Sequence, residues 1–171
     1  MNEASTMCNG VCYEDQRAKY PVQWKLPYIP GGRTLDDHST DLDAYSSNGY
    51  SEVDNRAMTA YYEVKATHKW FDSKNMRSLI IGRGNFPGMG KWGSRWGADN
   101  RPIPSQMAFS MIGLMYHNMM GIPFAGSDVC GVGDNTTPEL CARWHNVAAF
   151  YTFSRNHNHW DSLPQEPYVF T

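Results

Sequence analysis

The sequence contains neither a run of like charge nor a long apolar segment. Its 171 residues carry 15 Lys and Arg against 17 Asp and Glu, which gives a formal net charge of −2. Proteins that bind nucleic acid or anionic membranes usually concentrate basic residues on one face, so we expect neither partner. No stretch reaches the ~18 apolar residues that a membrane span requires, and the N-terminus lacks the pattern of a signal peptide. The sequence predicts either a cytosolic protein or one whose targeting segment is missing.

Cysteine is scarce, and its spacing does not suit a metal site. The four cysteines are an even set, consistent with two disulfides in an oxidising compartment, and free buried cysteines are the alternative: Cys8, Cys12, Cys130 and Cys141. No Cys-x-x-Cys or His-x-x-x-His pair accompanies His157 and His159 in "RNHNHW". The glycine-rich "GRGNFPGMGKWG" lacks the residues of a phosphate-binding loop. We therefore expect no metal and no cofactor.

The chain changes character near Asp72. Residues 1–71 are interrupted by proline, glycine and polar stretches, and we expect them to be rich in loops with one helix at roughly Asn55 to Phe71. From Lys74 onward, short apolar runs alternate with longer segments. "RSLIIGR" at 77–83 is typical of a strand buried on both faces, and "IPFAGSDVCG" predicts a second buried strand.

Two helices are predicted between and after these strands. "PSQMAFSMIGLMYHNMMG" begins after Pro104, stops at Gly121 and is apolar almost all round, as expected of a packed helix. "TPELCARWHNVAAFY" has Thr137 as an N-cap and Pro138 at the first helical position. Strands that alternate with helices indicate an α/β fold with a parallel sheet.

Polar residues follow the strand candidates at regular intervals. Asp99 and Asp128 are 29 residues apart, and so are Asp128 and His157, an interval close to the length of one strand-and-helix unit. Arg83 follows an earlier strand. Residues one unit apart recur at the same end of successive parallel strands, so these side chains are candidates for one pocket. The alternative is that Asp128 only ends a strand and His157 lies in a surface turn.

Several blocks of the sequence resemble one enzyme family. "MNEAST", "PYIPGG", "GRGNFPGMGKWGSRWGADN", "GIPFAGSDVCGV" and "ELCARWHNVAAFYTFSRNHN" look like consecutive blocks of glycoside hydrolase family 31, which includes maltase-glucoamylase, sucrase-isomaltase and acid α-glucosidase. The likeness is specific from Arg77 to Pro167 and looser from Asp36 to Phe71. It implies that 1–171 is a fragment of one catalytic domain, a partial (β/α)8 barrel containing roughly strands 5 to 7. Residues 1–71 would follow strand 4, and 72–171 would form β/α units.

The resemblance also implies an activity. The family hydrolyses terminal α-linked glucose with retention of configuration, so oligosaccharides of the maltose type are the expected substrates. It places the acid/base on Asp99 and binding of the sugar on Arg83, Trp96, Asp128 and His157. An acid in this role must be protonated at the working pH, so we expect burial or neighbouring groups to favour its neutral form.

The nucleophile of the family is the Asp that precedes the Met of "DMNE", and this sequence begins at that Met. We therefore expect the sequence to be a piece of a longer enzyme and to be inactive by itself. In a partial barrel, the Met-rich helix over Gln106 to Met120 would leave apolar side chains unburied. The alternative is a non-catalytic sugar-binding or interaction remnant of such an enzyme.

Secreted and lysosomal relatives suggest how the cysteines pair. The resemblance implies a Cys130–Cys141 disulfide, with Cys8–Cys12 as a weaker expectation, and places the parent protein in the secretory pathway, whether extracellular, at the cell surface or lysosomal. Asn135 lies in "NTT", a pattern for N-linked glycosylation.

Overall fold

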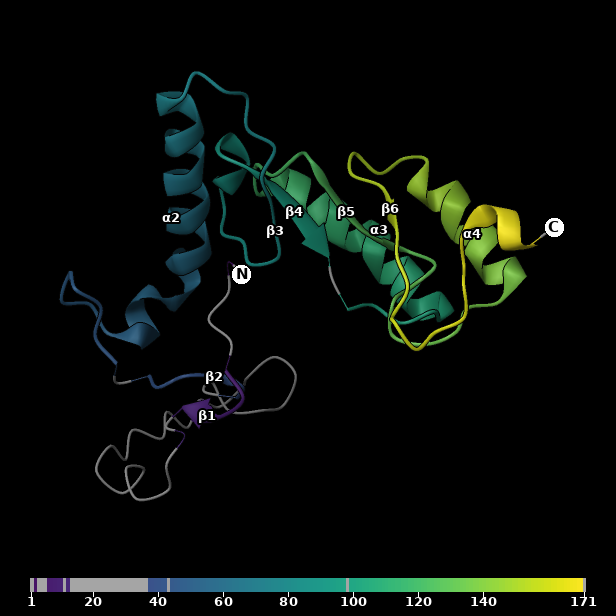
Figure 1. Cartoon of the computed structure of the whole chain (residues 1–171), viewed down its shortest axis with the longest axis horizontal. Coiled ribbons are helices and arrows are strands. Elements are labelled where there is room, and N and C mark those ends of the chain that lie inside the picture. The colour runs from purple at the N-terminus through teal and green to yellow at the C-terminus, as the bar shows by residue number, and fades with distance from the viewer. Residues whose placement is uncertain are drawn as a thin grey trace. The chain divides into compact units, whose positions relative to one another are not determined.

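The computed structural model of the chain describes residues 2, 6–10, 12, 37–42, 44–97 and 99–170 (Figure 1). Contacts within the chain group into two units, Met1–Ala60 and Tyr61–Thr171. The block "PYIPGG" and most of "MNEAST" lie outside the described residues.

The first unit contains two short parallel strands and the beginning of a long helix. Strand β1 (Asn9–Gly10) pairs with β2 (Ser39–Thr40), and helix α2 spans Glu52–Ser73. Glu52 favours the helix N-terminus electrostatically, and its carboxylate accepts a hydrogen bond of 2.9 Å from the Thr40 hydroxyl. Helix α2 confirms the predicted helix over Asn55 to Phe71.

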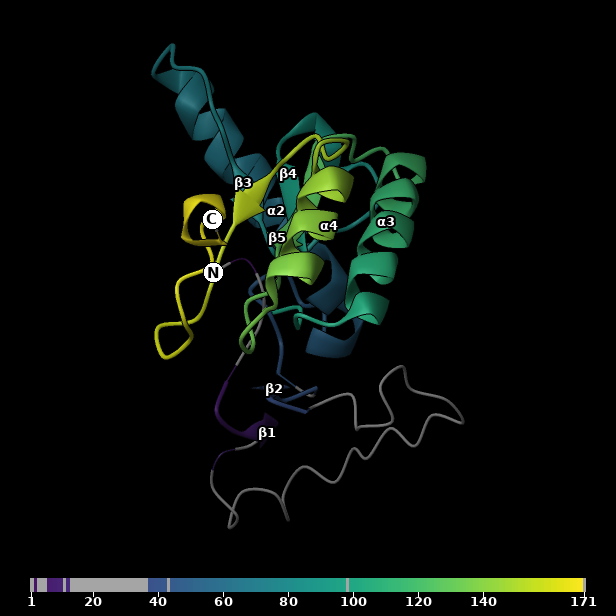
Figure 2. The same cartoon turned by 90° about the vertical axis from the view of Figure 1, so that its right-hand side faces the viewer.

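The second unit is built on a four-stranded parallel sheet in the order β3–β4–β5–β6. The strands follow chain order: β3 (Ile81–Gly82), β4 (Ser94–Gly97), β5 (Ala125–Val129) and β6 (Arg155–Asn156). Helix α3 (Pro104–Met119) connects β4 to β5, and α4 (Pro138–Ala148) connects β5 to β6. Figure 2 shows α3 and α4 side by side against the sheet. The prediction of an α/β fold with a parallel sheet is confirmed.

Helix α4 supplies three residues of the larger buried cluster, Cys141, Trp144 and Ala148. Its N-cap is Thr137, whose side chain accepts a hydrogen bond of 3.2 Å from the Leu140 amide, and Pro138 stands in the first turn, as predicted. Trp144 is fully buried and donates its indole N–H to the Tyr151 hydroxyl at 3.3 Å. The buried cluster around it links α4 to the end of β5: Val129, Cys130, Cys141, Trp144, Ala148 and Tyr151.

A smaller core lies at the other end of this unit. Val64 on α2, Met89 and Ile122 are buried together, with Trp92 packed against them. Met89 belongs to a short 3-10 helix, η1 (Met89–Lys91), and a second one, η2 (Pro167–Phe170), packs on α4 near the end of the chain (Figure 1).

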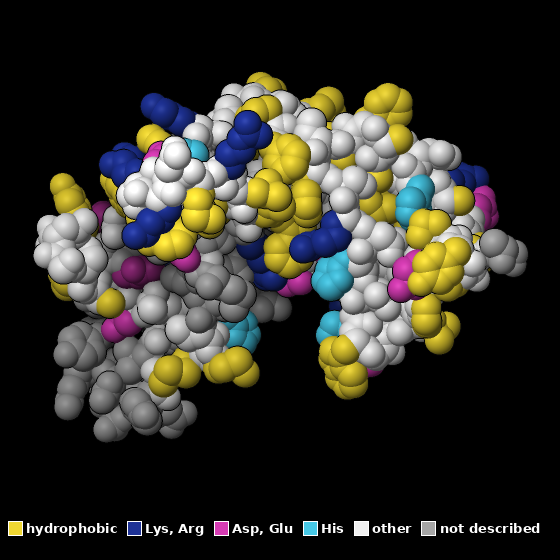
Figure 3. Space-filling model, turned by 45° about the horizontal axis from the view of Figure 1, so that its top comes forward, with side chains coloured by type: hydrophobic (Ala, Val, Ile, Leu, Met, Phe, Trp, Pro, Cys, Tyr) yellow, Lys and Arg dark blue, Asp and Glu magenta, His cyan; other side chains and the backbone are white. Residues whose placement is uncertain are grey.

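Two predictions about burial need correction. The "RSLIIGR" strand was expected to be buried on both faces, yet only Ile81–Gly82 form a strand, β3, at the edge of the described sheet, and Leu79 before it is 73% exposed. Helix α3 was expected to pack as a buried helix, but Ser110 is its one fully buried residue. Its apolar side chains remain largely exposed, as the partial barrel implied: Phe109, Ile112, Met115, Tyr116 and Met119. Figure 3 shows several groups of apolar side chains on the face that it displays.

Strand β5 and the segment just before β6 approach closely at Gly126. A Cβ at this position would overlap the carbonyl oxygen of Phe153, so this backbone arrangement requires glycine here. Within the described part of the chain, no helix combines the length and apolar character needed to cross a membrane.

Candidate active site

Asp128 is the centre of a polar cluster formed by three neighbouring strands. It lies on β5 and is fully buried. Its Oδ1 accepts a hydrogen bond of 2.7 Å from the Trp96 indole on β4 and lies 3.5 Å from Nε of Arg155 on β6. Asp128 and Arg155 are register partners in the parallel pair, so the sheet itself places the carboxylate beside the guanidinium.

Aromatic rings border this cluster. The Arg155 guanidinium carbon lies 4.2 Å from the centroid of the Trp96 ring, in the geometry of a cation–π contact. The His157 ring lies 6.4 Å from the same indole, centroid to centroid. Trp96 therefore contacts Asp128 through its N–H and Arg155 through its ring face.

Burial raises the pKa of the Asp128 carboxyl, because the charged form loses water. The Trp96 hydrogen bond and the electrostatic interactions with His157 and Arg155 oppose that rise. Among the described residues, Oδ2 of Asp128 has no hydrogen-bond partner. The cluster thus contains a buried acceptor with one oxygen still available to a donor.

Asp99 forms a separate pair with Arg83. Its Oδ2 lies 2.7 Å from Nη1 of Arg83, and the pair joins the segment after β4 to the residue after β3. Asp99 has φ of 56°, a left-handed conformation that Asp tolerates better than most residues. Its side chain is 65% exposed and its ionic neighbour is a cation. Asp99 is thus exposed and paired with a cation, and its role as the acid/base stays a prediction.

The regular spacing of 29 residues does not place Asp99, Asp128 and His157 at equivalent positions along their strands. Ser127 pairs with Gly97, and Asp128 pairs with Arg155. Asp128 therefore lies within β5, whereas Asp99 and His157 lie just beyond the ends of β4 and β6. The structure brings Asp128 together with His157 and Trp96, and it brings Asp99 together with Arg83.

Amide side chains hold the loops around this cluster. Asn100 donates from Nδ2 to the Asp128 carbonyl oxygen at 2.8 Å, and Asn156 donates to the Gln165 carbonyl oxygen at 3.2 Å. Gln165, fully buried, donates from Nε2 to the Gly131 carbonyl oxygen at 2.6 Å and also to that of His157. Each bond crosses from one strand end to another segment, so the loop positions depend on these amides.

Sequence reasoning missed Arg155, Asn100 and Gln165. Arg155 stands two residues before His157 in the quoted "SRNHN" block, and a search for a cation that could partner Asp128 would have found it there. The two amides carry no comparable signal, because their bonding partners are backbone atoms that depend on the fold.

Both predicted disulfides are confirmed. Cys8 bonds to Cys12 in the first unit, and Cys130 bonds to Cys141 in the second, with Cα atoms 4.6 Å apart. The second bridge ties the end of β5 to α4. The Asn135 Oδ1 accepts a hydrogen bond of 2.7 Å from the Leu163 amide. Glycosylation at Asn135 stays a prediction.

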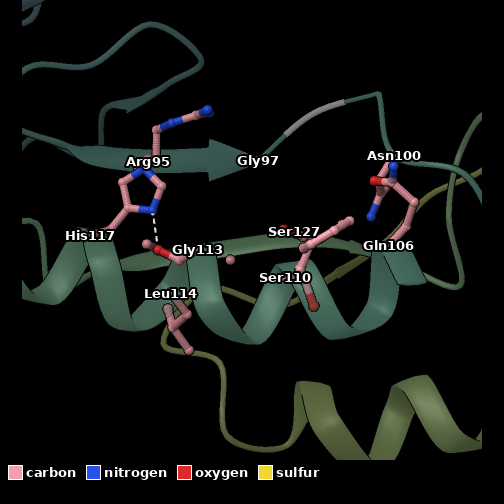
Figure 4. Close-up of a pocket in the computed structure, with 12 residues that line it drawn as sticks. Arg95, Gly97, Asn100, Gln106, Ser110, Gly113, Leu114, His117 and Ser127 are labelled. Atoms are coloured by element: carbon pink, nitrogen blue, oxygen red, sulfur yellow. Dashed lines mark hydrogen bonds between the residues drawn. The ribbon is translucent and has the colours of Figure 1, made fainter. Parts of the chain in front are cut away.

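A cavity of about 180 Å³ lies between α3 and strands β4 and β5 (Figure 4). It is lined by Arg95, Ser110, Ser127 and His117 among others, and by none of the predicted site residues. Burial lowers the pKa of His117, and the nearby Arg95 charge adds to that effect, whereas the hydrogen bond to the Gly113 carbonyl opposes it. This cavity lies at the helix-covered side of the sheet and is not the candidate site.

Comparison with known proteins links the whole chain to one family. The model of the glycosyl hydrolases family 31 TIM-barrel domain matches residues 1–171. The chain is 40% identical over 208 aligned positions to a lysosomal acid alpha-glucosidase of Tetrahymena pyriformis, covering 99% of this chain and 22% of the relative. It is 36% identical over 148 positions to an alpha-glucosidase of Aspergillus oryzae, covering 84% and 15%.

Solved structures agree on the fold. The crystal structure of a glucosidase II alpha subunit bound to alpha3-Glc2 superimposes with a TM-score of 0.74 and 25% identity, over 82% of this chain and 16% of that chain. The prediction of a partial (β/α)8 barrel is thereby confirmed. The chain spans between 15% and 22% of the length of the two curated relatives.

Proposed function

The chain belongs to glycoside hydrolase family 31, and we propose that it supplies one side of the active site of a retaining α-glucosidase. The observation that supports this proposal most directly is the group formed by Trp96, Asp128 and Arg155 at the carboxyl ends of adjacent parallel strands. In (β/α)8 enzymes this end of the sheet carries the catalytic residues.

Asp99 is the proposed acid/base. In a retaining mechanism, one carboxylate attacks the anomeric carbon while a second group protonates the leaving oxygen and later takes a proton from water. Asp99 stands past the end of β4 with an exposed side chain, so a glycosidic oxygen can reach it.

Arg83 must change partners if Asp99 is to act as an acid. In this structure Nη1 of Arg83 lies 2.7 Å from Oδ2 of Asp99, where the leaving glycosidic oxygen would have to bind. The resemblance assigns Arg83 to the sugar. We propose that sugar hydroxyls draw the guanidinium away from Asp99 on binding, which leaves the carboxyl free to hold a proton.

The rest of the cluster binds the terminal sugar. The indole of Trp96 offers an apolar face and His157 offers ring nitrogens, both partly exposed. Asp128 is fully buried, and its carboxylate contacts both the Trp96 indole N–H and the Arg155 guanidinium. In this structure it therefore holds these two side chains in position. A sugar hydroxyl would reach its free Oδ2 once the Arg155 side chain moves.

The relatives indicate a substrate and a compartment. Both curated relatives quoted above are alpha-glucosidases, and one is lysosomal. Together with the two disulfides, this supports hydrolysis of α-linked glucose from oligosaccharides of the maltose type by a protein of the secretory pathway.

The test uses a polypeptide in which this segment is part of a complete catalytic domain. Asp99→Asn should cut hydrolysis of maltose by orders of magnitude, and an aryl α-glucoside should lose less in the first step because its leaving group needs little protonation. Azide should then restore turnover as β-glycosyl azide, since this anion needs no general base. The matched control is Asp134→Asn, a surface carboxylate that is 64% exposed. Maltose turnover at the wild-type rate in Asp99→Asn would refute the assignment.

A further inference from the structure

We propose that Cys130, Cys141 and His145 form a redox-gated site for a thiophilic divalent cation such as Zn²⁺. The site is closed while the two cysteines are joined in a disulfide, and it opens when a dithiol reduces that bond. It is separate from the proposed sugar site and does not depend on the glucosidase assignment.

The three side chains already converge. Cys141 and His145 are four residues apart on α4, which places them on the same face of the helix, and Cys130 directly follows β5. Nδ1 of His145 lies 3.5 Å from Sγ of Cys130 and 3.7 Å from Sγ of Cys141. All three candidate ligand atoms lie within 4.8 Å of one another.

These distances match a tetrahedral zinc site. With Zn–S bonds of about 2.3 Å and a Zn–N bond of about 2.0–2.1 Å, a tetrahedral ion separates nitrogen from sulfur by about 3.6 Å and the two sulfurs by about 3.8 Å. His145 therefore stands at the required distance from both sulfurs. The change that remains is separation of the two sulfurs after the disulfide is broken.

The surroundings suit two thiolates and an entering ion. Both cysteines are fully buried, whereas His145 is only partly buried and faces solvent on one side, which gives the ion a route. Asn156 donates from Nδ2 to the Cys130 sulfur at 3.5 Å, a contact that would stabilise a thiolate there. His145 Nδ1 donates to the Cys141 carbonyl at 2.9 Å, so metal binding requires the ring proton to move to Nε2.

The chemistry balances in two steps. A dithiol transfers two electrons and two protons, so the Cys130–Cys141 bond breaks, two S–H bonds form, and the dithiol becomes a cyclic disulfide. Zn²⁺ then displaces the two thiol protons to water and binds the neutral imidazole. Water takes the fourth position, since the cluster provides three protein ligands.

The test is a cobalt titration of the chain in a Cys8→Ser/Cys12→Ser background, which removes the other cysteine pair. The protein is reduced with a phosphine, which becomes its oxide and competes weakly for metal, and Co²⁺ is added under anaerobic conditions. We expect a thiolate-to-cobalt charge-transfer band that saturates at one equivalent, is displaced by Zn²⁺ and is missing from the disulfide form. No band after reduction, or a band of equal size before it, would overturn the proposal.

Histidine variants identify the third ligand. His145→Ala should weaken Co²⁺ binding at least tenfold, His145→Cys should restore it with a more intense charge-transfer band, and His159→Ala, a partly exposed control, should bind as before. Far-UV circular dichroism in the same titration follows folding. If His145→Ala binds as tightly as the reduced parent, or if reduction abolishes helicity that metal does not restore, the site does not exist.

Discussion

Removing Arg155 should destabilise the protein because Asp128 would keep a buried charge without its cation. The Arg155 side chain is 39% exposed, and Asp128 is fully buried. The cation–π contact with Trp96 is worth about 0.5–2 kcal/mol, and a hydrogen bond or ion pair to a charged group about 1.5–3 kcal/mol. Since the guanidinium is partly solvated and 3.5 Å from Oδ1, we expect Arg155→Ala to lower the free energy of unfolding by about 2 kcal/mol at neutral pH.

The loss of stability caused by Arg155→Ala should depend on pH, and it should be larger at neutral pH than in acid. Burial raises the pKa of Asp128 in the folded state, so its ionisation costs stability as pH rises from about 3.8 through the folded value. Arg155 reduces that cost. The effect of Arg155→Ala should therefore be fully present above the folded pKa and should shrink as acid protonates Asp128.

Urea unfolding at several pH values measures this, in a double-mutant cycle with Asp128→Asn. In the Asp128→Asn background, Arg155→Ala should cost about 1 kcal/mol or less, because only the ring contact remains. Arg143→Ala is the control, since that arginine pairs with Glu139 on the surface and should cost about 0.5 kcal/mol or less. A loss that is equal in both backgrounds, or equal to that of the control, would refute the charge argument.

Three further outcomes are expected. In a complete catalytic domain, His157→Ala should lower kcat/KM for maltose by about 10- to 150-fold. That factor is the equivalent of one charge-assisted hydrogen bond. An unchanged kcat/KM would mean that His157 lies in a surface turn without a role in binding the sugar. Gly126→Ala should destabilise the sheet strongly because its Cβ would overlap the Phe153 carbonyl, whereas Gly113→Ala on α3 meets open space and should be neutral or stabilising in the same urea assay. Thr137→Ala should cost about 1 kcal/mol through loss of the N-cap of α4, and an unchanged unfolding midpoint would contradict that role.

Local patterns in the sequence were sufficient for most elements of the fold. The alternation of apolar runs with helical segments predicted a parallel α/β sheet, and the Thr137–Pro138 pair marked the start of α4 correctly. These features depend on neighbouring residues, so a linear pattern contains them. Burial was harder to predict. The apolar run at 77–83 forms only the two-residue strand β3 at the edge of the sheet, Leu79 before it is exposed, and the strand order that sets this edge depends on residues far away in the chain.

The candidate site shows the same division. Arg83, Trp96, Asp99, Asp128 and His157 were found from spacing and from family blocks, and their roles stay predictions. The spacing of these residues in the sequence does not reveal the register in which the strands pair. Because Asp128 pairs with Arg155 and not with His157, a residue that was not predicted became the direct partner of the buried carboxylate.

The sequence by itself determined the chemical groups: the carboxylates, the cations, the capping threonine and four cysteines that can pair. These follow from residue identity and short-range spacing, which folding does not change. Only the tertiary structure decided which groups meet. It buried Asp128 between Trp96 and Arg155, left Asp99 exposed beside Arg83, and placed His145 against the Cys130–Cys141 bridge. The reason is physical: hydrogen bonds and ion pairs act over a few ångströms, and the strand register and helix packing that set such distances join residues tens of positions apart.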